Sequence, residues 1–178
     1  MSDNIEQLYV NFVDSLSAIN LQQNPTLYSI SQEHYAKSFL VSAASKFEMK
    51  ICRLVREFAH LRSNGNAQIK SFIEANGIAR QYHTYFKWDD PRNANSFFKL
   101  FGDEFSDQAK SIVKSDAELE SSVKAFLLLG QLRNRLVHKN YLDFSLDKTM
   151  KELHDDYQKA KYFVEWLEVI LLRPHDGD

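Results

Sequence analysis

The chain has 178 residues, a formal net charge of −2 and a hydrophobic fraction of 44%, which together predict a single soluble domain with a sizeable core over 1–178. This charge excludes an overall basic protein that binds nucleic acid without selection, although a local basic patch is compatible with it. Cys52 is the only cysteine, and the chain shows neither a signal-peptide core at its start nor an apolar run of membrane-spanning length, so we expect a cytoplasmic protein without disulfides or a cysteine-rich zinc site.

Hydrophobic residues recur at helical spacing along most of the chain, and Gly and Pro are scarce, which predicts long uninterrupted helices. The helices that we expect, in chain order, cover residues 4–20, 32–61, 67–76, 93–101, 103–114, 116–138 and 147–172. Ser31 is placed to cap the second helix, Gly77 and Gly102 to end the third and fourth, and Ser115 with Glu118 to form a capping box before the sixth. Strand patterns and internal repeats are absent from the sequence. The pattern therefore predicts an all-α bundle of four main helices with short helices inserted in the middle.

Three features of the chain allow both an ordinary and a functional interpretation. The run HTYFKW at 83–88 is more typical of core or interface packing than of a platform on which RNA bases stack. Asp89 and Asp90 precede a proline, which favours a turn over a metal site, because hard cations need several converging oxygens. Cys52 lies in the second helix, where we expect it to be buried and inert.

The helix predicted over 116–138 carries polar residues within its apolar sector. On a helical wheel, an apolar line consists of Leu119, Val123, Phe126, Gly130 and Val137. Arg133 falls about 40° to one side of this line and Asn134 about 60° to the other. An unpaired charge on a packed side is costly, so Arg133 needs a buried partner, a ligand or another subunit. Arg135 falls on the polar side, where a solvated charge is expected.

His138 ends the same helix, one turn after Asn134, so these two side chains lie on one face. Arg133 and His138 are about 140° apart around an ideal helix, so one straight helix would not direct both at one small target. Either the helix unwinds at His138, or a second copy of the chain supplies the complement across a two-fold axis.

The cluster has the groups needed for RNA cleavage without a metal ion. The ribose 2′-OH must lose a proton to attack the adjacent phosphate, and the leaving 5′-oxygen must gain one, a transfer that suits histidine near neutral pH. A guanidinium can stabilise the charge that builds on the phosphate oxygens. From the residues alone, an equally good interpretation is a core ion pair for Arg133 and a helix-end position for His138.

The sequence RNRLVH at 133–138 resembles the motif of the HEPN superfamily, small all-α domains of prokaryotic defence and toxin systems in which Arg precedes His by four to six residues. The segment 38–55 resembles the second long helix of the RiboL-PSP type of this superfamily, with Glu48 in the place of an acidic residue that faces the active site. FKLFG at 98–102 is similar to that group too, so the resemblance covers most of the chain.

This resemblance implies a metal-independent endoribonuclease that needs no cofactor and acts as a homodimer, leaving a 2′,3′-cyclic phosphate. It implies a toxin or phage-defence effector, with an antitoxin or other defence protein as a partner. The residues that it assigns to the site are Arg133, His138 and Asn134 for catalysis, and Glu48, Arg135, Lys139 and Tyr141 in support.

The resemblance also leaves alternatives. HEPN toxins with nucleotidyltransferase antitoxins carry a tyrosine two residues after the histidine, whereas this chain has Asn140 there and Tyr141 one residue later, so that regulation is not expected. One alternative function is a catalytically inactive HEPN module that binds RNA, a nucleotide or a protein. Another is a plain helical interaction protein, in which Arg133 would be locked to Glu48 and closed to solvent.

Overall fold

The computed structural model describes residues 4–19, 22–79, 81–139, 141 and 143–173, and in these residues it is all-α, without strands. The elements in chain order are α1 (Asn4–Ser17), α2 (Pro25–Arg62), α3 (Ala67–Ile73), the π-helical turn η1 (Glu74–Ile78), α4 (Tyr82–Tyr85), α5 (Asn95–Lys99), α6 (Asp103–Ser115), α7 (Ala117–His138) and α8 (Met150–Leu172). The predicted fold class is therefore confirmed, with α1, α2, α7 and α8 as the main helices. None of the described helices is long and apolar enough to cross a membrane.

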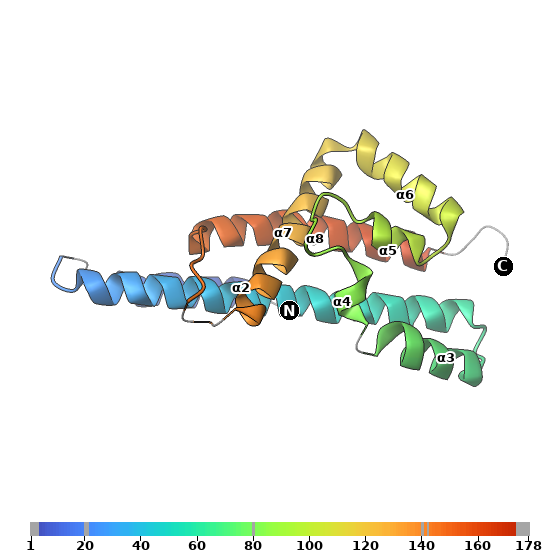
Figure 1. The fold of residues 1–178 in the computed structure, drawn as a ribbon, viewed down its shortest axis with the longest axis horizontal. Helices are drawn as coiled ribbons and strands as arrows, with labels where there is room; N and C mark the ends of the chain where they lie inside the picture. The colour runs from blue at the N-terminus through green and yellow to red at the C-terminus, as the bar shows by residue number, and fades with distance from the viewer. Residues whose placement is uncertain (1–3, 20–21, 80, 140, 142, 174–178) are drawn as a thin grey trace.

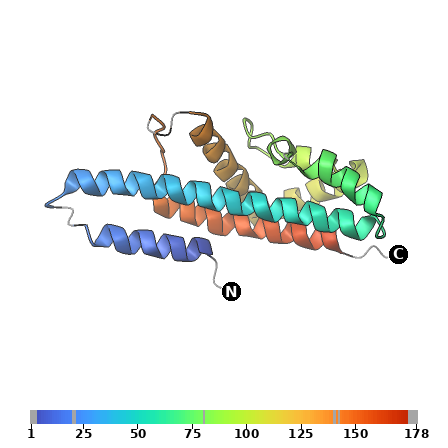
Figure 2. The ribbon, with the colours of Figure 1, turned by 90° about the horizontal axis from the view of Figure 1, so that it is seen from below.

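The long helix α2 is the axis of the molecule (Figure 1). Helix α8 lies along one side of α2, and α1 packs against the N-terminal half of α2, as Figure 2 shows. Helix α7 crosses α2 and α8 at an angle, α3 lies beside the C-terminal half of α2, and α6 lies next to α5 and the start of α7 (Figure 1). The C-terminal end of α7 therefore reaches the middle of α2 from outside the α2–α8 pair.

The core lies where α2, α7 and α8 meet. Phe47 of α2 is buried at its centre, with its ring 5.5 Å from the Phe126 ring of α7 and 5.0 Å from the Tyr157 ring of α8. Buried aromatic side chains of this kind each contribute about 1.5–3 kcal/mol through removal of apolar surface from water. A polar link adds to the packing, because the buried Ser122 hydroxyl of α7 donates to the Lys159 carbonyl of α8 at 2.7 Å.

Two predicted N-terminal helix caps, Ser31 and Ser115, are wrong. Helix α2 begins at Pro25, and Ser31 lies inside it, because proline is well tolerated at the first helical position and no breaker separates it from Ser31. Ser115 ends α6 and forms no capping box; Asp116 caps α7, with its Oδ1 accepting from the Glu118 and Leu119 N–H groups.

The observed capping box lies at the start of α8. The Thr149 hydroxyl accepts from the Glu152 N–H at 3.2 Å, and the Glu152 carboxylate accepts from the Thr149 N–H at 2.8 Å. This cap places the first residue of α8 at Met150, three residues later than the sequence predicts.

Of the two predicted glycine positions, one is confirmed and one is wrong. Gly102 has a φ of +97° between α5 and α6, where a side chain would be strained. Gly77 does not have a positive φ and does not end its helix, since the chain continues through η1 to Ile78. The Tyr85 hydroxyl donates to the Gly77 carbonyl at 2.5 Å, which ties this turn to α4.

The segment after η1 packs against α7 through Trp88. Tyr85, Phe86 and Trp88 are buried, which bears out core packing for the aromatic run. The Trp88 ring occupies the space beside Gly130, where a Cβ would lie 1.9 Å from the ring atom Cζ3. Gly130 therefore sits in the middle of α7 so that this segment can approach the helix closely.

Candidate functional site

Arg133 of α7 lies beside Asn134 and Glu48 of α2. Its Nη1 donates to Asn134 Oδ1 at 3.1 Å, and its Nη2 lies 3.5 Å from Glu48 Oε2, at the outer limit of a hydrogen bond. The Arg133 side chain keeps 32% of its surface exposed, and that of Glu48 keeps 37%. An exposed pair at this distance contributes little to stability, so Arg133 is neither locked to Glu48 nor closed to solvent.

His138 is exposed at the last helical position of α7. The helix does not unwind before it, because the Lys139 N–H still donates to the Arg135 carbonyl at 3.1 Å. The angle of about 140° between Arg133 and His138 is therefore kept. Within the part of the chain that the structure describes, the His138 ring has no hydrogen-bond or ion-pair partner.

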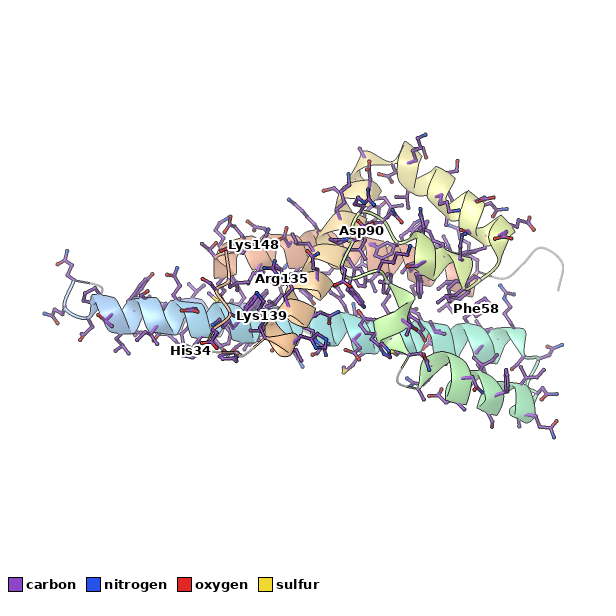
Figure 3. All side chains as sticks on the ribbon, in the orientation of Figure 1. His34, Phe58, Asp90, Arg135, Lys139 and Lys148 are labelled. Atoms are coloured by element: carbon purple, nitrogen blue, oxygen red, sulfur yellow. The ribbon has the colours of Figure 1, made fainter. Side chains whose placement is uncertain are left out.

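The supporting residues of the motif lie around the C-terminal end of α7. Figure 3 labels Arg135 and Lys139 there. The guanidinium of Arg135 is 5.7 Å from the centroid of the Phe144 ring. Both cations are exposed, as expected for Arg135 from the helical wheel.

Tyr141 lies after the end of α7 and contacts two residues of α2. Its hydroxyl lies 3.5 Å from His34 Nδ1, with the two rings stacked. Its backbone carbonyl accepts a hydrogen bond of 2.9 Å from Lys37 Nζ. Asn140, which takes the place of the tyrosine found in antitoxin-regulated relatives, lies outside the described residues.

Arg133 and Asn134 also line a cavity of about 370 Å³ between α2, α7 and the segment that follows η1. The polar and aromatic residues that line it are Glu48, Cys52, Arg56, Tyr82, His83, Trp88, Arg133 and Asn134. Burial raises the pKa of the Tyr82 hydroxyl well above its usual value, and the charge of Glu48 adds to this effect. The phenol is thus a neutral donor, and within the described residues it has no hydrogen-bond partner.

A model of the family described as RiboL-PSP-HEPN matches residues 4–172. The chain belongs to the RiboL-PSP-HEPN family. The match spans every helix of the structure and confirms the resemblance drawn from the motif at 133–138. No curated protein and no solved structure matches the chain.

Tyr82 and Trp88 are cavity residues of this HEPN chain that the sequence did not predict. Trp88 lies inside the aromatic run at 83–88, but nothing in that run shows that its ring borders a cavity at Arg133. Cys52 was expected to be buried, whereas it is half-buried and lines the cavity. Burial and the charge of Glu48 raise the pKa of the Cys52 thiol, so the neutral, unreactive form is favoured as expected.

A larger cavity of about 800 Å³ in this HEPN domain lies apart from the motif, between α2, α3, η1 and the end of α8. It is lined by Arg56, Leu61 and Ile78 among others and contains none of the predicted site residues. Size alone does not make it the functional site, because it lies apart from the motif at 133–138 and its Arg56 is already paired with Glu74 at 2.9 Å.

Asp89 and Asp90 form part of a turn. The Asp90 carboxylate pairs with the Arg92 guanidinium through bonds of 2.5 and 2.6 Å. Over the described ranges, no group of three or more His, Cys, Asp or Glu side chains is arranged to hold a metal ion. These observations support the turn interpretation.

Proposed function

We propose that this HEPN protein is a metal-independent endoribonuclease that cleaves RNA by attack of the ribose 2′-OH. One observation carries the proposal: Arg133 is accessible and only weakly paired, and it precedes the exposed His138 by five positions in one unbroken helix. Among the residues that the structure describes, His138 has no partner. Membership of the HEPN family supports it. We also propose that residues 1–178 form a single domain.

In the proposed reaction, His138 accepts the proton of the 2′-OH as the oxygen attacks the adjacent phosphorus. The bond from phosphorus to the 5′-oxygen breaks, and that oxygen receives a proton, either from a second His138 or from water. Arg133 donates two hydrogen bonds to the phosphate oxygens on which negative charge builds. The products are a 2′,3′-cyclic phosphate and a free 5′-hydroxyl.

The geometry of α7 supports a homodimer as the active species. Because α7 stays helical through His138, one chain does not direct Arg133 and His138 at the same phosphate, and a second copy can complete the pair. Two large apolar side chains next to site residues are exposed: Met49, beside Glu48, at 69%, and Val137, beside His138, at 57%. We propose that the second subunit covers them.

Arg135, Lys139 and Asn134 support the reaction in this proposal. The two exposed cations flank the catalytic helix end and suit contacts to neighbouring phosphates, while Asn134 holds the Arg133 guanidinium through its Oδ1. By family membership we further propose a toxin or phage-defence role with a protein partner. Growth arrest on expression, absent with His138→Ala, is the expected cellular result.

The test is RNA cleavage in EDTA by the parent protein, Arg133→Ala and His138→Ala. Matched controls are Arg53→Ala and His60→Ala, which remove exposed side chains of the same types from α2. We expect cyclic-phosphate ends from the parent and both controls, and a loss of at least about 100-fold in rate for the two motif variants. Undiminished cleavage by folded His138→Ala would refute the proposal.

A second function is favoured by the cavity beside Arg133, which can hold a ligand whether or not cleavage follows. In this alternative the protein is an inactive HEPN module that binds RNA, a nucleotide or a protein. Saturable RNA binding without cleavage by folded, dimeric parent protein would establish it.

A further inference from the structure

We propose that the cavity between Glu48, Tyr82 and Arg133 binds a guanine base of single-stranded RNA, next to the phosphate held by Arg133. The inference rests on the proposed function in that it takes RNA as the ligand. It goes beyond that function because it names the nucleotide that the site selects and the residues that select it.

The position of the cavity connects it to the motif. Arg133 and Asn134 line the cavity and also belong to the motif, so a nucleotide whose phosphate meets the guanidinium has its base within reach of the cavity. A volume of about 370 Å³ lies at the lower end of the range for small-molecule sites, about 300–1,000 Å³. A single extruded base fits this space and a base-paired helix does not, which points to unpaired RNA.

The walls of the cavity are aromatic and preformed. The half-buried Tyr82 ring lies against the Trp88 ring, with centroids 5.5 Å apart. Trp88 is fixed in turn by its close approach to Gly130 and by a hydrogen bond of 3.1 Å from its Nε1 to the His83 carbonyl. Fixed aromatic side chains of this kind offer stacking surfaces for a base at little entropic cost.

The cavity also presents unused polar groups. The Glu48 carboxylate has about four acceptor positions, and its contact to Arg133 involves Oε2 at the long distance of 3.5 Å. The neutral Tyr82 hydroxyl can donate to an acceptor. The neutral Cys52 thiol adds no charge. The cavity lining thus holds one carboxylate, that of Glu48, which only accepts. Its donors are the Tyr82 hydroxyl, the Arg133 guanidinium and the Asn134 amide, and the lining also includes His83 and Arg56, which is paired with Glu74.

Guanine is the base that matches this set. Its N1–H and its N2 amino group are adjacent donors that can both meet one carboxylate, while its O6 accepts from a hydroxyl. Adenine and cytosine each place an unprotonated ring nitrogen beside their amino group, which would face the carboxylate. Uracil has one N–H between two carbonyl oxygens that Glu48 would repel. The carboxylate thus favours guanine and disfavours the other three bases.

The test measures binding of short single-stranded RNAs to the full-length His138→Ala protein, so that cleavage does not interfere. The RNAs differ at one central position, which carries guanosine, inosine or 7-deazaguanosine. Inosine lacks only the N2 amino group, and we expect it to bind roughly tenfold more weakly because one hydrogen bond to a charged acceptor is lost. We expect 7-deazaguanosine to bind like guanosine, because its change lies on the opposite edge of the base.

Variants of the cavity residues then test whether the cavity causes the difference in affinity between guanosine and inosine. In the same background, Glu48→Gln should remove most of the difference between guanosine and inosine, and Tyr82→Phe should weaken guanosine binding. The matched controls Glu120→Gln and Tyr162→Phe change exposed residues outside the cavity and should preserve the difference. Circular dichroism checks that each variant is folded.

Equal affinity for guanosine and inosine, or a difference that persists in Glu48→Gln, would overturn the inference, as would a lack of RNA binding. Cleavage by the parent without preference for guanosine would refute this inference and leave the proposed nuclease intact. Discrimination in binding without any cleavage by the parent would refute the nuclease and leave this inference intact.

Discussion

The Nζ of Lys37, in α2, donates a hydrogen bond of 2.9 Å to the backbone carbonyl of Tyr141, three residues after His138. Lys37 is only 2% exposed, and its charge is balanced by Glu33 at 2.7 Å and by the Tyr141 ring, whose centroid lies 4.9 Å away. This buried lysine therefore anchors Tyr141 to the side of α2. The end of the helix that carries His138 is held at a fixed place as a result.

We predict that Lys37→Met destabilises the protein by about 1.5–3 kcal/mol, because it removes a buried charged donor from the Tyr141 carbonyl and from Glu33 while keeping the apolar stem. Urea unfolding measures this change in free energy. The control is Lys124→Met, which breaks an exposed pair with Glu120 in α7 and should change stability by only about 0.2–0.5 kcal/mol. Equal effects of the two variants would show that the Lys37–Tyr141 bond does not anchor Tyr141.

Gly130→Ala is predicted to destabilise the protein by about 1–3 kcal/mol, although alanine is the better helix former. The new methyl group would lie 1.9 Å from the Trp88 ring, so the ring must move and the wall of the cavity moves with it. Thermal unfolding and tryptophan fluorescence report the two effects. Gly77→Ala is the matched control, because its Cβ would meet only Ile73, at 3.7 Å, and we expect unchanged or slightly higher stability there.

The exposed Val137 next to His138 gives a test of the proposed dimer. We predict that Val137→Glu converts the protein to monomers and lowers RNA cleavage in parallel, because a buried, unpaired charge disfavours association. Sedimentation or light scattering measures the mass. Val169→Glu, on an exposed position of α8 at 46%, should leave both properties unchanged. A dimer that survives Val137→Glu would place the subunit interface elsewhere.

The same valine shows where reasoning from the sequence reached its limit. The helical wheel placed Val137 on the buried line of α7 together with Leu119 and Val123, which are indeed buried. Because α7 crosses α2 and α8 at an angle, a line of residues that is buried at its middle leaves the packing surface at its end. Periodicity correctly predicted the helix and the burial of Leu119 and Val123, but the crossing angle depends on tertiary packing.

The candidate site, too, was only partly predictable from the sequence. The spacing of Arg133 and His138 is evident in the sequence. That Glu48 lies close to them was expected from the family resemblance. The cavity could not be predicted from the sequence, because it forms only when the segment around Tyr82 packs over α7. That fold depends on the fit of Trp88 to Gly130, which are 42 positions apart in the sequence. A local pattern carries no information on such a contact.

We predict from the buried Tyr85 hydroxyl how the free energy of unfolding changes at alkaline pH. Burial raises its pKa from the usual 10 to about 12, so the folded protein keeps the proton at pH values where the unfolded chain has lost it. The unfolded state then binds fewer protons, and the free energy of unfolding must fall as the pH rises from about 10 towards 12. Tyr85→Phe should flatten this fall, and at neutral pH it should lower stability by about 0.5–1.5 kcal/mol, because the bond to the Gly77 carbonyl is lost. Urea unfolding at a series of pH values measures both effects, and an unchanged alkaline slope in the variant would assign the titration to other groups.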